Sequence, residues 1–208
     1  MNISGKMRHG LLLGVAFFTL HSSLFTLTSC KADNEYSTWP CRFAYDNGIH
    51  QDATLASAMD VNVPGMFCLI TESVQGGVKY LNFKSNYNRE SSLPETEAEK
   101  RAEYILGLNN GIIVGFQNSQ LDASGNYLIV AYDVQCPNCV RNYDNYVSPH
   151  YAIQAASTGI ATCKKCGKHY DLNNGGILQD GQQGDRNLEK YAAATTGPFG
   201  HISVGTKR

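Results

Sequence analysis

The sequence lacks an excess of charge of either sign. Its 208 residues contain 17 lysines and arginines against 18 aspartates and glutamates, which gives a formal net charge of −1. Non-specific binding to nucleic acid needs a broad positive field that attracts the phosphates. The composition therefore excludes a general nucleic-acid-binding protein, and we expect no nucleic-acid partner.

The sequence also lacks the motifs of common catalytic sites. It contains no G-x-S-x-G sequence, no cysteine and histidine arrangement typical of a thiol nucleophile, and no glycine-rich phosphate loop. Hydrolase and nucleotide chemistry consequently find no support in the sequence. We expect no enzymatic activity.

Cysteine, glycine and tyrosine, by contrast, are plentiful. The chain has seven cysteines, 20 glycines and 12 tyrosines, and 42% of its residues are hydrophobic. The apolar content is enough for a packed core. The rest of this composition is typical of a loop-rich β protein whose cysteines hold parts of it together. With no internal repeat, residues 41–208 are expected to form one domain.

The first 29 residues have the pattern of a secretory signal peptide. Lys6 and Arg8 precede an apolar stretch at residues 11–20, and a second short apolar run follows at 24–27. A transmembrane helix is the alternative. His21 and two serines interrupt the apolar run, however, and a histidine is costly in hydrocarbon. A cleaved signal is therefore favoured over a membrane span.

The end of this segment, Leu-Thr-Ser-Cys at residues 27–30, resembles the processing site of a bacterial lipoprotein. The resemblance implies that Cys30 becomes the N-terminal residue and carries lipid, so that the partner of this end of the chain is a lipid bilayer. Residues 30–40 would form a tether. Lys31 followed by acidic residues resembles the surface-export signal of some Bacteroidetes lipoproteins, which favours the outer over the inner membrane of the cell envelope.

The rest of the chain alternates between strand patterns and turns. Four segments rich in β-branched and aromatic residues predict two hairpins, 65–71 with 78–83 and 111–116 with 127–133. Asp52 followed by good helix formers predicts one short helix near residues 52–59. The charged stretch at 94–103 is typical of a solvated loop or helical turn, and we assign it no chemistry.

The strongest chemical signal is a pair of C-x-x-C sequences. Cys136 and Cys139 form the first, and Cys163 and Cys166 form the second after 23 intervening residues. Each C-x-x-C can fold as a tight turn with both sulfurs on one side, so two such turns supply four soft ligands to one metal ion. The alternative is a set of disulfides, since thiols do not usually persist in an oxidising compartment.

Two further cysteines stand apart from these pairs. Neither Cys41 nor Cys68 belongs to a ligand-like turn, and Cys68 lies in an apolar strand pattern. They are either buried thiols or one disulfide that joins the N-terminal segment to the first strand of the predicted hairpin. The compartment favours the disulfide.

The residues around the two pairs resemble the cluster-binding half of the Rieske iron-sulfur family. The resemblance is carried by Tyr-Asp-Val-Gln-Cys-Pro at 132–137, Cys-Lys-Lys-Cys-Gly-Lys-His-Tyr-Asp-Leu at 163–172, and Gly-Gly-Ile-Leu at 175–178. It implies an all-β fold of stacked antiparallel sheets with two metal-binding knuckle loops, at 136–139 and 163–166. The residue pattern adds one short N-terminal helix to this fold.

The resemblance is incomplete at the metal ligands. Cys136 and Cys163 match the two cysteines of the family, and Cys166 occupies the place of its second histidine. Cys139 follows one residue later than the first histidine would. Because two imidazoles on one iron raise the potential of a Rieske cluster, four thiolates put that redox function in doubt. His169 could replace one cysteine, but its place in the pattern puts it on the strand that leaves the loop.

Four thiolates in two short turns suit zinc, a mononuclear iron of rubredoxin type, or a two-iron cluster. We favour zinc because it needs neither redox support nor assembly machinery. The sequence thus predicts a lipid-anchored envelope protein with a structural zinc site and a binding or scaffolding role. The alternative is an electron-transfer protein with an iron-sulfur or rubredoxin-type iron centre. No protein partner can be named from the sequence.

Overall fold

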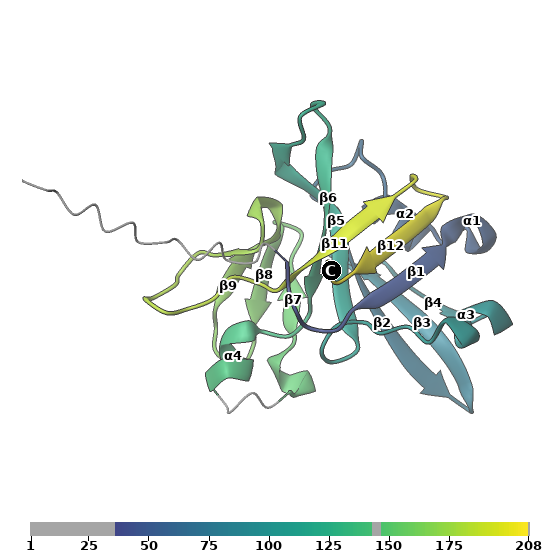
Figure 1. Cartoon of the computed structure of the whole chain (residues 1–208), viewed down its shortest axis with the longest axis horizontal. Helices are drawn as coiled ribbons and strands as arrows, with labels where there is room; N and C mark the ends of the chain where they lie inside the picture. Colours follow the sequence, from purple (N-terminus) through teal and green to yellow (C-terminus); the bar gives the residue numbers. More distant parts are fainter. Residues whose placement is uncertain (1–35, 143–146, 208) are drawn as a thin grey trace, which may run out of the picture. The chain divides into compact units, whose positions relative to one another are not determined.

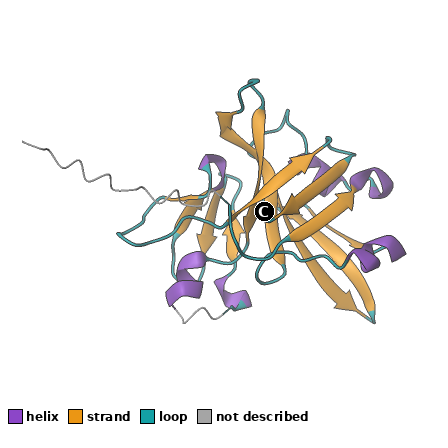
Figure 2. Ribbon diagram, viewed as in Figure 1, coloured by secondary structure: helices purple, strands orange, loops and turns teal. Residues whose placement is uncertain are grey.

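The computed structural model describes residues 36–142 and 147–207, which form part of one compact unit built mainly from antiparallel strands (Figure 2). The larger sheet is curled and has eight strands in the order β1-β12-β11-β6-β5-β2-β3-β4. Their bounds are β1 Arg42–Asp46, β2 Phe67–Gln75, β3 Val78–Ser85, β4 Glu90–Pro94, β5 Gly111–Leu121, β6 Tyr127–Asp133, β11 Lys190–Thr195 and β12 His201–Gly205.

The smaller sheet has four strands in the order β10-β9-β8-β7. Their bounds are β7 Ile153–Ala155, β8 Ile160–Cys163, β9 His169–Asp171 and β10 Ile177–Leu178. This sheet and helix α4 (Pro137–Asn142) lie together, away from helices α1 (Asn47–His50) and α3 (Glu97–Ala102) (Figure 1). The described residues thus divide into a large sheet and a smaller module that holds both C-x-x-C pairs.

Both predicted hairpins are present. Strands β2 and β3 pair around Gly76 and Gly77, whose positive φ angles of 57° and 82° suit the tight turn between twisted strands. Strands β5 and β6 pair as expected, but β5 runs on to Leu121 past a register shift. The predicted mainly β class is therefore confirmed, whereas details specific to a Rieske fold are not established.

The expectation of a single short helix is wrong. Helix α2 (Ala53–Ala58) is the predicted one, and the Asp52 side chain accepts a hydrogen bond from the Leu55 N–H at 2.7 Å. The described residues contain three further short helices and two 3-10 turns, η1 Pro149–Tyr151 and η2 Leu172–Asn174. Local capping explains two of these helices. Asp46 caps α1, and Thr96 with Glu99 forms a capping box at α3.

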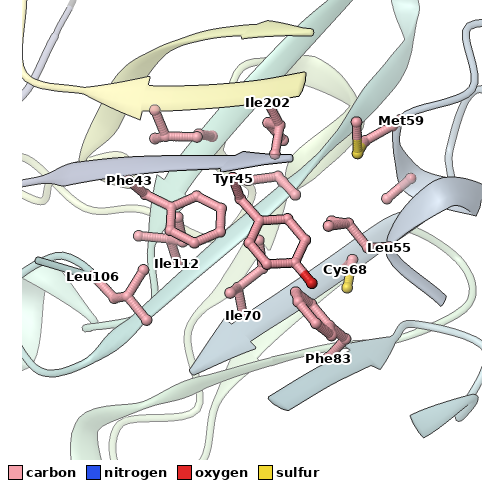
Figure 3. Close-up of a cluster of buried hydrophobic side chains, with 14 of the residues drawn as sticks. Phe43, Tyr45, Leu55, Met59, Cys68, Ile70, Phe83, Leu106, Ile112 and Ile202 are labelled. Carbon is pink, nitrogen blue, oxygen red and sulfur yellow. The ribbon is translucent and has the colours of Figure 1, made fainter. Parts of the chain in front are cut away.

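Alternation along the strands divides the core into two clusters of buried side chains. Ile112 and Val114 of β5 face the cluster that Figure 3 shows, together with Phe43, Tyr45 and others beneath α2. Ile113, which points to the opposite face of the same strand, belongs to a second cluster that the large sheet shares with the C-x-x-C module. The second cluster fixes the module against the sheet.

Cys41 and Cys68 are free thiols in the structure. The disulfide expected between them is therefore not present. Cys41 lies beside the Val204 carbonyl, at 3.9 Å from its sulfur, whereas Cys68 points into the core from β2 (Figure 3). Burial raises the pKa of the Cys41 thiol to about 12 and also raises that of Cys68. Both thiols are consequently protonated, buried side chains of the core.

The predicted signal peptide and the predicted lipidation site, Cys30, lie outside the described residues. Residues 36–40, predicted to be part of the tether, contact the domain. The Ser37 N–H donates to the Lys190 carbonyl at 2.7 Å, and Trp39 packs on both core clusters. Among the residues described, no helix has the length and apolar character needed to cross a membrane.

Candidate metal centre

The first knuckle is held in place by a buried carboxylate at the end of β6. Asp133 accepts hydrogen bonds from the Leu108 and Gln135 N–H groups, both at 2.7 Å, and from the Tyr191 hydroxyl at 2.6 Å. Burial raises the pKa of Asp133 to about 6, and these donors oppose the rise. The residue is therefore ionised at neutral pH, and it directs the chain from β6 towards Cys136.

The second knuckle is the turn between β8 and β9. The Gly167 N–H donates to the Cys163 carbonyl at 2.8 Å, and the Cys163 N–H donates to the Lys168 carbonyl at 3.0 Å. Gly167 has a φ of 73°, in the left-handed region that glycine adopts without strain. The turn places Cys163 at the end of a strand and brings Cys166 back beside it.

The two knuckles face one another and bring four sulfurs together. The Sγ atoms of Cys136, Cys139, Cys163 and Cys166 all lie within 4.8 Å of one another. Two distances across the knuckles, from Cys136 to Cys166 and from Cys139 to Cys163, are both 3.7 Å. Sulfurs at the corners of a tetrahedron with zinc-sulfur bonds near 2.3 Å are about 3.8 Å apart. The donor set and its spacing therefore fit one tetrahedral metal ion.

Burial of the site is uneven. Cys136, Cys139 and Cys163 are at most 1% exposed, whereas Cys166 is exposed. The neighbouring Cys163 sulfur, followed by burial, raises the pKa of Cys136, and burial raises the pKa of Cys139 to about 12. Without a cation Cys136 and Cys139 keep their protons. A metal ion would displace the protons and stabilise the thiolates.

A short chain of hydrogen bonds from neighbouring side chains ends at the Cys136 sulfur. The Tyr170 hydroxyl lies 3.0 Å from the Cys136 sulfur, and the Asn138 amide N–H donates to the same hydroxyl oxygen at 2.9 Å. Because this oxygen already accepts from Asn138, its own proton is free to point at the sulfur. Both side chains have no measurable exposure. The hydroxyl is therefore held in position to donate to the Cys136 sulfur.

Asn138 also attaches the loop that follows β10. Its amide N–H donates to the Arg186 carbonyl at 2.8 Å, and its amide oxygen accepts from the Arg186 N–H at 2.9 Å. Nearby, the Lys168 ammonium lies 2.6 Å from the Asp185 carboxylate. No local signal in the sequence points to a role for Asn138 or for this loop. Their contacts depend on a fold that brings residues 48 positions apart together.

The other polar residues near the pairs are not ligands in this arrangement. His169 is exposed and lies 3.1 Å from the Asp180 carboxylate, and His150 is also exposed. Asp171 caps the η2 turn by accepting from the Asn173 N–H at 3.0 Å. Among the described residues, the group able to hold a metal ion consists of the four cysteines alone.

No protein-family model, no curated protein and no solved structure matches this chain.

Proposed function

We propose that the four-cysteine site binds one zinc ion whose role is structural, in a lipid-anchored envelope protein that serves binding or scaffolding. The observation that carries the metal site is the convergence of four sulfurs from two knuckles to within 4.8 Å of one another. Four thiolates in a tetrahedral arrangement are the common donor set of structural zinc sites, which leave no open position for a substrate.

The structural role follows from what the knuckles connect. The first extends from β6 of the large sheet, and the second joins β8 and β9 of the small sheet. An ion shared by both would tie the two sheets together next to the second core cluster, which itself includes Cys136, Cys139 and Cys163. Metal binding would then contribute directly to the free energy of folding.

Electron transfer through an iron centre is the second candidate. It is favoured by one observation, the exposure of Cys166 beside three buried ligands. A ligand at the surface would give an electron a short path to a partner. The Tyr170 hydrogen bond to Cys136 would also influence the potential of an iron centre, because hydrogen bonds to ligand sulfurs are one of its determinants.

Membership of the Rieske family is part of the same proposal. The two knuckles, the strand that enters the first one, and Tyr170 after the second one support it. The envelope location and the lipid on Cys30 are supported by the sequence pattern of residues 1–30. A signal and a lipidation site of this kind predict a protein held at a membrane surface by its N-terminus.

Metal analysis with visible spectroscopy separates the two functions. Zinc thiolates are colourless, whereas iron thiolates absorb visible light. A colourless protein with one zinc per chain supports the structural role. An absorbance that dithionite bleaches and air restores would replace it with electron transfer.

A further inference from the structure

The four sulfurs of the candidate metal centre differ in their access to solvent. Cys166 is exposed, whereas the other three cysteines of the site are at most 1% exposed. The whole tip of the second knuckle, residues 164–167, is exposed with it. A Cβ atom added at Gly167 would meet no other atom within 4 Å, so the space beside Cys166 is open. A small solute can therefore reach the Cys166 sulfur from water, while protein covers the other three sulfurs.

A bound zinc ion would make this exposed sulfur a nucleophile. The thiolate, and not the thiol, is the reactive form of cysteine, and a thiol that coordinates a metal ion loses its proton. Oxidation of cysteine by peroxide follows thiolate character and exposure. Because all four ligands of a zinc site are thiolates, exposure decides which of them a peroxide meets first. In this site that ligand is Cys166.

A partner for an oxidised Cys166 lies in the opposite knuckle. The Cys136 sulfur is 3.7 Å from the Cys166 sulfur. Since a disulfide bond is about 2.05 Å long, the two sulfurs would have to approach by roughly 1.7 Å. The exposed turn that carries Cys166 has open space in which to move. Cys136 is buried beside the Tyr170 hydroxyl and can keep its position.

The two cysteines outside the site do not compete for this reaction. Cys41 and Cys68 are 6% and 0% exposed and belong to the first core cluster. Neither is part of the four-sulfur group. Among the cysteines that the structure describes, Cys166 is the exposed one, so oxidation in the folded protein should begin there.

We propose that Cys166 is an oxidation site, at which hydrogen peroxide converts the zinc centre into a disulfide between Cys136 and Cys166. This inference rests on the zinc site proposed above. Once these two sulfurs are joined to each other, Cys139 and Cys163 are the thiolates left to hold the ion. Two ligands do not complete a tetrahedral zinc site, so the zinc ion leaves and both thiolates take up protons.

The oxidation proceeds in two steps. The Cys166 thiolate attacks one oxygen of the peroxide, the O–O bond breaks, and a sulfenic acid and a hydroxide ion form. The Cys136 thiolate then attacks the Cys166 sulfur, the S–O bond breaks, and a second hydroxide ion leaves. Protons from the solvent convert both hydroxide ions to water. Two electrons pass from the two sulfurs to the peroxide.

The disulfide would keep the two knuckles connected after the ion has left. It would join the segment that follows β6 to the turn between β8 and β9, across 30 positions of the chain. A covalent bond would then replace the ion as the link between the two sheets. The site would thus respond to an oxidising compartment, where such bonds persist, and keep the small sheet in place.

Zinc release from the zinc-loaded full chain measures this reaction. Zinc content is determined first, one equivalent of hydrogen peroxide is added, and a chromophoric chelator reports the zinc that is freed. Cys166→His removes the exposed thiol and keeps four ligands, since three cysteines with one histidine are a common structural donor set for zinc. We expect this variant to release zinc about tenfold more slowly than the wild type. Lys164→His adds a histidine to the same exposed tip, keeps Cys166, and should behave as the wild type.

Peptide mapping of the oxidised wild type gives a readout that needs no variant. A disulfide between Cys136 and Cys166, formed as one zinc is lost, supports the oxidation site. A first disulfide that lacks Cys166, or equally fast zinc release from Cys166→His, would overturn it and leave the zinc site intact. A wild type that holds no zinc before peroxide is added would contradict the proposed function itself, and the oxidation site with it.

Discussion

At the scale of single residues, the surroundings of Cys136 place a fixed hydroxyl group beside its sulfur. The Tyr170 hydroxyl is held by Asn138 so that its proton is available to the sulfur. Tyr170 and Asn138 lie in or next to the cysteine motifs of the sequence. Neither residue type, however, indicates that one would hold the hydroxyl of the other beside the Cys136 sulfur. Their contact joins positions 32 residues apart, and only the folded small sheet brings them together.

Replacing this tyrosine tests the hydrogen bond to the sulfur. Tyr170→Phe removes the donor and leaves the ring, so we expect zinc affinity to fall about 10- to 150-fold, since a hydrogen bond to a charged group contributes roughly 1.5 to 3 kcal/mol. Competition with a chromophoric chelator measures it. Tyr132→Phe is the matched control. That buried hydroxyl donates to the Leu172 carbonyl at 3.0 Å and not to a sulfur. Equal losses of affinity in both variants would show that the tyrosine acts only through packing.

Asp133 fixes the direction in which the chain leaves β6 and enters the first knuckle. Asp133→Asn exchanges an acceptor of three hydrogen bonds for an amide whose NH₂ group would face a donor. We expect a loss of about 2 to 3 kcal/mol in the free energy of unfolding, measured by denaturant titration at pH 7. An unchanged midpoint would mean that these three hydrogen bonds do not stabilise the knuckle.

At the scale of elements, the hairpins and α2 were predictable because alternation, glycine turns and an Asp cap are local signals. The additional helices were not. Helix α4 begins inside the first C-x-x-C sequence and runs past it, and α3 forms in a stretch whose charge pattern left a loop and a helical turn equally open. The burial of Glu95 could not be predicted either. It depends on the register of β3 with β4 and on the residues that pack opposite this position in the folded protein.

Loss of a cysteine from one knuckle should disrupt both knuckles. Because one ion would close both, Cys163→Ser should release the metal, lower the melting temperature by about 10 °C or more, and expose the segment between the pairs to protease. Lys164→Ser alters an exposed residue in the same turn and should leave all three properties unchanged. If Cys163→Ser melts and resists protease as the wild type does, the site does not support the fold.

At the scale of the whole molecule, the sequence indicated the four cysteines of the site and the mainly β class, since both depend on residue type and spacing. It also predicted that the two pairs converge, as the four sulfurs do, but not what holds the knuckles face to face, because that depends on how the second core cluster packs the small sheet against the large one. It also pointed to a disulfide between Cys41 and Cys68. The structure instead uses both as buried thiols in one apolar core.

Attachment to a membrane is the prediction that concerns the chain as a whole. If Cys30 is the lipidated N-terminal residue, cells fed a fatty-acid analogue should label the wild type and not Cys30→Ala. The label should stay with the protein after extraction in detergent. Equal labelling of the two proteins would contradict lipid attachment at Cys30.

The metal content of the protein purified without added metal tests the central claim most directly. We predict one zinc per chain by elemental analysis, no visible absorbance, and loss of that zinc when Cys136 and Cys163 are both replaced by serine. A wild type that contains no more metal than this double variant would contradict a four-cysteine metal site. Stoichiometric iron with a reversible visible absorbance would contradict the zinc assignment.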